Sequence, residues 1–166
     1  MDEKIKLIDF GSCKGMKGQG HTEYVSTRWY RSPECLLTKG YYDYKMDVWG
    51  VGCVFFEILS LFPLFPGKNE LDQIHKIHDV LGTPPKHVLQ RFKRNQNTHI
   101  KFNFPAKRGA GIRHLIPHVS NECCDLIMKM LIYDPKERIT AGEALRHEYF
   151  RDLKEIDSLK QFQKTL

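Results

Sequence analysis

The pattern of apolar positions predicts a mainly α-helical protein. Residues 45–59 are apolar on nearly every side, which is typical of a helix at the centre of a domain. Asn69, Ser120 and Thr140 each precede an apolar repeat of helical spacing and are expected to cap a helix. A short helical turn is expected at 35–39. Together these segments indicate a helical domain built around one central helix.

Four other stretches have a different pattern. Residues 4–8 alternate briefly and contain β-branched side chains, which predicts a short strand. Residues 12–24 are rich in Gly, Lys and Ser, as a loop would be. Residues 84–118 are basic and interrupted by Pro and Gly, so we expect a long irregular insertion. Residues 151–166 repeat an apolar side chain every third position, which fits a surface-packed helix or a frayed end.

Composition narrows the class of protein. Apolar residues make up 41% and charged residues 28% of the 166 positions, a balance typical of globular domains. The net charge is +6, and a basic surface of this kind favours anionic or phosphorylated partners. Nucleic-acid binding rests on charge alone and is the weaker interpretation. No apolar stretch is long enough to cross a bilayer, so no membrane partner is expected.

Cysteine and histidine add little chemistry of their own. The five cysteines are irregularly spaced and follow no signal peptide, so free thiols in a reducing compartment are expected. His75 and His78 share one helix face, but no Cys or acidic residue completes a recognisable metal-ligand set. We therefore expect an intracellular protein without a transition-metal site.

Several short motifs carry the functional signal. Asp9-Phe10-Gly11 follows the expected strand and offers a carboxylate for Mg²⁺ beside a glycine that permits a sharp turn. An ordinary turn is the alternative for these three residues alone. Thr22-Glu23-Tyr24 places two hydroxyls that can accept phosphate in the glycine-rich loop. Ser26-Thr27-Arg28-Trp29-Tyr30-Arg31-Ser32-Pro33-Glu34, Asp47-x-Trp49-x-x-Gly52 and Asp134-Pro135-x-x-Arg138 follow in that order.

In this order, the motifs resemble the mitogen-activated protein kinase group of serine/threonine kinases. That group has T-x-Y phosphosites and ends its activation segment in A-P-E, where this chain has Ser32 in place of alanine. The resemblance extends to about residue 152. Glu34-Cys35-Leu36-Leu37, Phe65-Pro66-Gly67 and Asn69–Ile74 narrow it to one branch of the group.

The resemblance implies a fold and a domain layout. The fold is a partial, mainly α protein-kinase-like C-terminal lobe with a short N-terminal strand remnant. Residues 1–34 would hold the strand and activation segment, and 35–152 the helical lobe with an insert at about 84–118. Residues 153–166 would be a tail. The N-lobe and the catalytic loop would be absent.

The resemblance also implies roles for individual residues. Asp9 would bind magnesium, and Thr22 and Tyr24 would be regulatory phosphosites. The residues expected to face substrate or contact phosphate are Thr27, Arg28 and Arg31. Three others would be structural: Glu34 and Arg138 would form a buried ion pair that pins the activation segment, and Asp47 would hydrogen-bond the catalytic loop.

The missing parts of the family pattern determine the expected activity. Phosphoryl transfer in kinases needs a Gly-rich loop, a strand lysine and an H-R-D catalytic loop, and all of them precede D-F-G. Only eight residues precede Asp9, and H-R-D occurs nowhere. We therefore expect the parent enzyme to transfer the γ-phosphate of ATP to Ser or Thr with magnesium. The chain by itself is expected to be inactive, to bind neither cofactor well and to be marginally stable.

Two alternatives stay open. The chain can be a non-catalytic module that binds substrates or regulators, or, more weakly, a basic nucleic-acid binder. The partners expected on the kinase interpretation are protein substrates, an upstream activating kinase, and a missing lobe or a chaperone covering exposed apolar surface. Cytoplasm, nucleus and cilium all fit the family.

Overall fold

A computed structural model describes residues 6–10, 28–38, 43–94 and 101–153. Its regular elements, in chain order, are the 3₁₀ turn η2 (Arg28–Tyr30), α1 (Pro33–Leu37), α2 (Lys45–Ser60), α3 (Glu70–Leu81), α4 (Lys86–Arg94), α5 (Asn121–Met130), α6 (Ala141–Leu145) and η3 (Glu148–Phe150). No strand occurs in these ranges. The regular elements of the described part are therefore all helical, as the apolar pattern predicts.

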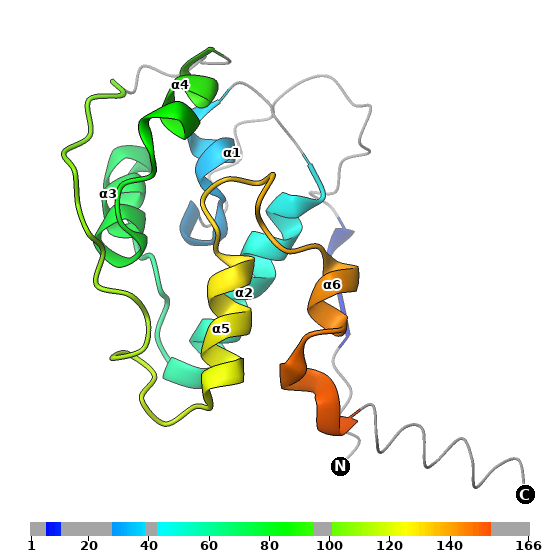
Figure 1. Ribbon diagram of the computed structural model, residues 1–166. Helices are drawn as coiled ribbons and strands as arrows, with labels where there is room; N and C mark the ends of the chain where they lie inside the picture. Colours follow the sequence, from blue (N-terminus) through cyan, green and yellow to red (C-terminus); the bar gives the residue numbers. More distant parts are fainter. Residues whose placement is uncertain (1–5, 11–27, 39–42, 95–100, 154–166) are drawn as a thin grey trace, which may run out of the picture.

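Helix α2 lies at the centre of the domain (Figure 1). It packs against α5 along one side and against η2 near its middle, while α1 contacts both α3 and α4. The larger core cluster draws buried side chains from α1 to α5 and from the segments that connect them: Leu36, Leu37, Trp49, Cys53, Phe56, Leu64, Phe65, Ile74, Ile77, Val88, Phe92, Ile112, Ile116, Cys123, Ile127, Leu131 and Tyr133. The central position predicted for 45–59 is confirmed.

The contact between α2 and α5 requires a glycine. A Cβ atom built on Gly52 would lie 2.9 Å from Cβ of Met130 and 3.1 Å from a methyl carbon of Leu131. Because real Cβ atoms almost never approach this closely, only glycine lets the two backbones come together here. Gly52 of the Asp47-x-Trp49-x-x-Gly52 motif therefore has a packing role.

The predicted helix starts are confirmed by their cap hydrogen bonds. The side chain of Asn69 accepts from the Asp72 amide at the start of α3, and that of Ser120 accepts from the Cys123 amide at α5. At α6, Thr140 and Glu143 form a reciprocal capping box. Such caps satisfy backbone donors that have no partner inside the helix.

Two sequence expectations need correction. Residues 6–8 of the expected strand at 4–8 are described and form no strand, because ladder hydrogen bonds need a neighbouring strand and the described part contains none. Residues 84–118 are not irregular throughout, since they contain α4. Val88 and Phe92, four positions apart, bury one face of that helix in the core, and this tertiary contact outweighs the loop-like composition.

Helix α2 also carries an apolar face that the other described elements leave exposed. Val51, Val54 and Ile58 are 55%, 47% and 62% exposed, although they belong to the most apolar helix of the chain. Their spacing places them along one side of the helix. This face agrees with the exposed apolar surface that a missing lobe or a chaperone was expected to cover.

Two further observations complete the fold. No helix in the described ranges is long and apolar enough to cross a membrane. Cys35, Cys53, Cys123 and Cys124 are free thiols, and Cys13 lies outside the described residues. Most of the tail, 154–166, also lies outside them.

Candidate functional site

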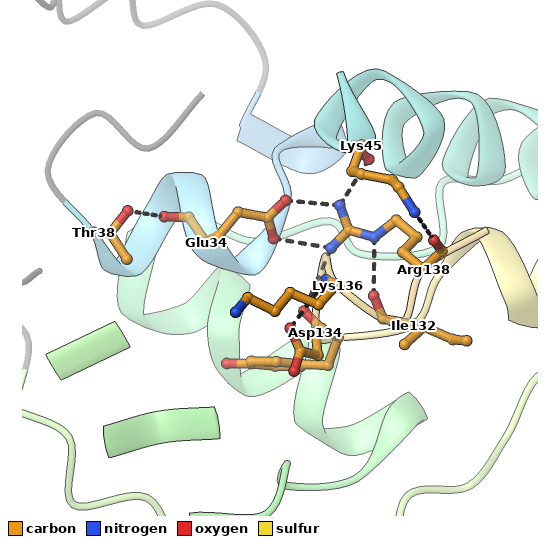
Figure 2. Close-up of polar contacts among 8 residues, drawn as sticks. Glu34, Thr38, Lys45, Ile132, Asp134, Lys136 and Arg138 are labelled. Atoms are coloured by element: carbon orange, nitrogen blue, oxygen red, sulfur yellow. Dashed lines mark hydrogen bonds and ion pairs between the residues drawn. The ribbon is translucent and has the colours of Figure 1, made fainter. Parts of the chain in front are cut away.

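A buried ion pair joins α1 to the loop that follows α5 (Figure 2). Nη1 of Arg138 lies 2.7 Å from Oε1 of Glu34, and Nη2 lies 2.9 Å from Oε2. Both side chains are 0% exposed. This is the two-pronged geometry in which a guanidinium binds a carboxylate most strongly. The resemblance to kinases predicted that Glu34 and Arg138 would pair. The structure brings the two side chains together although they are 104 positions apart in the chain.

Arg138 also donates to the backbone of two segments. Nη1 donates to the carbonyl of Lys45 at 2.7 Å, and Nε donates to the carbonyl of Ile132 at 2.9 Å. In return, Nζ of the buried Lys45 donates to the carbonyl of Arg138. The start of α2, the first turn of α1 and the 132–138 loop therefore meet at one guanidinium (Figure 2).

An aromatic layer covers the same guanidinium. Cζ of Arg138 lies 5.0 Å from the centre of the Trp49 ring, within range of a cation–π contact. On the core side, Trp49 stacks on Phe65 with ring centres 5.7 Å apart. Trp49 is 0% exposed, so the ion pair rests directly on the hydrophobic core.

Two buried polar atoms, Nε1 of Trp49 and Oγ of Ser32, have no hydrogen-bond partner within the part of the chain that the structure describes. Ser32 stands where the family pattern has alanine. A residue without a polar side-chain atom would satisfy this position equally well, because the hydroxyl makes no contact that alanine would lose. The departure from A-P-E is therefore structurally tolerable.

The segment 28–30 is fastened to the start of α3 by a ring of hydrogen bonds. Nε1 of Trp29 donates to the Gly67 carbonyl at 3.0 Å, and the Gly67 amide donates to Oε1 of Gln73 at 3.0 Å. Nε2 of Gln73 closes the ring on the Trp29 carbonyl at 3.2 Å. Alongside, Nη1 of Arg28 donates to the Lys68 carbonyl. Gln73 is fully buried and fixes the position of η2.

We expect Gly67→Ala to break this ring and to lower the free energy of unfolding by about 1–3 kcal/mol. A Cβ at position 67 would lie 2.4 Å from Oε1 and 2.5 Å from Cα of Gln73, so the side chain and the backbone both obstruct it. Urea unfolding measures the loss. Gly142→Ala is the control, because its nearest neighbour would be a flexible arginine tip at 3.7 Å. Equal stability of the two variants would contradict the prediction.

Tyr30 ties the same segment to the central helix. Its hydroxyl donates to Oε2 of Glu57 at 2.6 Å. That hydrogen bond and then burial raise the pKa of Tyr30 to about 12, so the phenol stays protonated and keeps donating at neutral pH. Segment 28–34 is thus held at three points, by Gln73, Glu57 and Arg138.

Asp9 is exposed and has a positive φ of 60°. Asp is one of the few residues that adopt this left-handed conformation, and such backbone is common at functional sites. A carboxylate oxygen is a ligand that Mg²⁺ prefers. However, the described ranges contain no group of three His, Cys, Asp or Glu side chains that would hold a metal. Among the described residues, Asp9 is therefore a candidate ligand without the other members of a metal site.

Of the other residues predicted for the site, the structure describes Arg28, Arg31 and Asp47. Asp47 lies exposed in the first turn of α2, and Arg31 is half-buried after η2. Thr22, Tyr24 and Thr27 lie outside the described residues.

Sequence reasoning missed three polar contacts that the tertiary structure creates. One is the role of Gln73. Another is a second two-pronged ion pair, in which Arg91 of α4 binds Asp134 at 2.7 and 3.1 Å. In the third, Nε2 of the buried His78 lies 3.2 Å from the Tyr133 hydroxyl. Burial lowers the pKa of His78 to about 4, so this histidine is neutral and structural at pH 7. For these three contacts, the sequence offered one clue, which is that Asp134 belongs to the Asp134-Pro135-x-x-Arg138 motif.

Comparison with known proteins agrees with this geometry. The family model described as "Protein kinase domain" matches residues 1–150, so the chain belongs to the protein kinase family. It is 55% identical over 154 residues to the MAPK/MAK/MRK overlapping kinase of Homo sapiens, covering 92% of this chain and 36% of that protein. The corresponding Mus musculus protein is 57% identical over 148 residues, covering 89% and 35%.

The serine/threonine-protein kinase MAK of Homo sapiens is 44% identical over 150 residues, covering 90% of this chain and 24% of that protein. The near relatives of this chain are therefore MAP-kinase-like. The branch of the group to which the 65–74 segment pointed is that of the MAPK/MAK/MRK overlapping kinases. The chain spans about a third of the length of the first two relatives.

Proposed function

We propose that these residues form the activation segment and helical C-terminal lobe of a serine/threonine kinase of the MAP-kinase-like group. The observation that carries the proposal is the buried Glu34–Arg138 pair. It locks the glutamate that ends the Ser32-Pro33-Glu34 motif to the arginine of Asp134-Pro135-x-x-Arg138. The boundaries proposed are 1–152 for the partial kinase domain, with an insert at about 84–118, and 153–166 for a tail.

The proposed regulation uses the segment just before α1. Phosphate on Thr22 or Tyr24 would add nearly two negative charges, which guanidinium groups bind strongly. Arg28 and Arg31 are the nearest arginines in the sequence and lie on a segment that is already held in place. Thr27 and these arginines would then face the substrate, with an upstream kinase supplying the phosphate.

In the whole domain, ATP and magnesium would supply the transferable phosphoryl group and its charge neutralisation. Of the described residues, Asp9 would hold the metal. Asp47 and the Glu34–Arg138 pair would shape the protein around the reaction without touching it. Intact domains of this kind act on Ser or Thr of protein substrates.

A polypeptide of these 166 residues is expected to transfer no phosphate, because it contains neither H-R-D nor a Gly-rich loop ahead of Asp9. The test incubates the purified chain and its Asp9→Ala variant with γ-labelled ATP, magnesium and a general kinase substrate. A full-length relative serves as the positive control. Label incorporated by the chain and abolished by Asp9→Ala would overturn the expectation of inactivity.

A second candidate function is a non-catalytic module that binds substrates or regulators. The exposed face of α2 favours it, because Val51, Val54 and Ile58 form an apolar surface that a missing lobe, a partner or a chaperone would cover. The two functions predict native polypeptides of different length. An antibody against residues 84–118 can detect the native polypeptide and show its mass. A larger product with an upstream H-R-D peptide supports the kinase, whereas a 19.5 kDa product phosphorylated on Thr22 or Tyr24 supports the module.

The proposed location is inside the cell, in the cytoplasm, nucleus or cilium. Four free cysteines, two of them buried, are compatible with a reducing compartment. Fractionation followed by detection of the 84–118 segment tests this placement.

A further inference from the structure

The charges of this chain are strongly segregated. Between Val80 and Asn121 there are eight Lys and Arg residues and no Asp or Glu. The rest of the chain holds the other 18 basic residues and all 20 acidic ones. The formal net charge of this segment, +8, therefore exceeds the +6 of the whole chain. The remainder of the chain has a slightly negative net charge.

Helix α4 presents much of this charge to solvent. Its inner face, Val88 and Phe92, is buried in the core, so the helix has a defined orientation. Lys86, His87, Lys93 and Arg94 are exposed on the other sides. In the described part of the chain, Lys86, Lys93 and Arg94 form no salt bridge. The outward face of α4 is thus positive and uncompensated.

A second strip of positive charge is fastened beside the start of α4. The Thr83 amide donates to the Lys107 carbonyl, and the Lys107 amide donates back to Oγ1 of Thr83, both at 3.0 Å. Oγ1 of Thr83 also donates to the Pro105 carbonyl. These bonds place the exposed Arg108 next to the turn that leads into α4. The hydrogen bonds of Thr83 thus bring residues 107–108 beside the turn that precedes α4.

Two cations of this segment form ion pairs with carboxylates of the same chain. Arg91 of α4 takes the carboxylate of Asp134 in two-pronged geometry, and Lys107 pairs with Asp79 of α3. Two cations of the segment, Arg91 and Lys107, are thus already paired with carboxylates. The remaining cations project outward and have no carboxylate from the described residues.

We propose that the outer face of α4, together with residues 107–108, docks an acidic segment of a partner protein. This surface lies outside the activation segment, and its use does not depend on phosphoryl transfer. Nine helical residues extend about 13 Å, which matches roughly four residues of an extended peptide. Alternating Glu or Asp side chains over that length would reach Lys86, Lys93 and Arg94.

Charge and shape favour a peptide over other polyanions. Val88 and Phe92 of α4 are buried in the core, so the outer face does not offer them for insertion into a lipid bilayer. A nucleic acid is recognised over a longer charged track and, when single-stranded, by exposed aromatic rings. Phe102 and Phe104, the nearby aromatics, are half-buried against the core instead.

The test measures the affinity of the 166-residue chain for a fluorescent Glu-rich peptide by anisotropy, without ATP. The same peptide with Gln in place of Glu is the neutral control. We expect only the Glu peptide to bind, with affinity falling steeply as ionic strength rises from about 0.02 to about 0.3 M. The double variant Lys93→Glu/Arg94→Glu should weaken binding by about tenfold or more.

The matched variant is Lys68→Glu/Arg146→Glu, which changes the net charge equally at exposed residues outside the 80–121 segment. We expect it to change affinity by less than about threefold. Circular dichroism checks that both variants keep their helices. Carbodiimide cross-linking of the Glu peptide, followed by mass spectrometry, should identify Lys86 or Lys93 in the unmutated chain.

Three results would overturn the proposal. Equal losses in the two variants would mean attraction by net charge alone. Cross-links confined to lysines outside 80–121 would place the peptide elsewhere. Tighter binding of duplex DNA or of phosphatidylserine vesicles than of the Glu peptide would assign the surface to another class of partner.

Discussion

Replacing Arg138 with methionine is expected to lower the free energy of unfolding by about 3–5 kcal/mol. The substitution keeps most of the side-chain volume and removes the charge. Glu34 would then be a fully buried carboxylate without its cation, and the carbonyls of Lys45 and Ile132 would each lose a donor. Removing one member of a buried pair is costly because the remaining charge or polar group has no water to replace it.

Urea unfolding followed by tryptophan fluorescence measures this loss, and far-UV circular dichroism shows whether the variant is folded without denaturant. The control is Lys129→Met, which removes an exposed pair with Asp125. Exposed pairs contribute about 0–1 kcal/mol. A loss for Arg138→Met as small as that of the control would show that the Glu34 pair does not support the fold.

The double variant Glu34→Gln/Arg138→Met separates the charge effect from the packing effect. It removes the unpaired carboxylate, so we expect it to be more stable than Arg138→Met alone. If it is less stable, the lost backbone contacts of Arg138 matter more than the buried charge.

Trp49→Ala is expected to lower the free energy of unfolding by about 3–5 kcal/mol. Trp49 is fully buried, stacks on Phe65 and lies under the Arg138 guanidinium, so alanine would leave a large cavity at the junction of the core and the ion pair. The neighbours come from helices and loops that the core holds in place, and they can fill such a cavity only in part.

Trp49→Phe is the matched variant. It keeps an aromatic ring against Phe65 and Arg138, and it removes the Nε1–H group that has no hydrogen-bond partner. We expect it to retain more than half of the stability that alanine loses, since eliminating an unsatisfied donor offsets part of the lost volume. Similar losses for phenylalanine and alanine, again by urea unfolding, would contradict this account.

Much of the helical framework was readable from local sequence. The caps at Asn69, Ser120 and Thr140 involve residues three positions apart, so a short segment contains all the information they need. The central position of 45–59 followed from its uniformly apolar composition. The prediction for 4–8 was wrong over the described 6–8, because a strand depends on a neighbour that local sequence does not specify.

Helix α4 shows the opposite error. Its segment is basic and lies among prolines, and it becomes a helix because Val88 and Phe92 reach a core made by residues far away in the chain. The outward orientation of its cations, on which the proposed docking surface depends, is a consequence of the same burial.

The sequence alone determined the family pattern, the helix caps, the segregation of charge and the candidate pair of Glu34 with Arg138. Only the tertiary structure decided that Gln73 fastens Trp29 to Gly67, that Arg91 holds Asp134 and that His78 is buried against Tyr133. The reason is physical. Caps and periodicity act within one or two helical turns. Apart from the short step from Gly67 to Gln73, these contacts join residues more than 35 positions apart in the chain. They form only when the core packs.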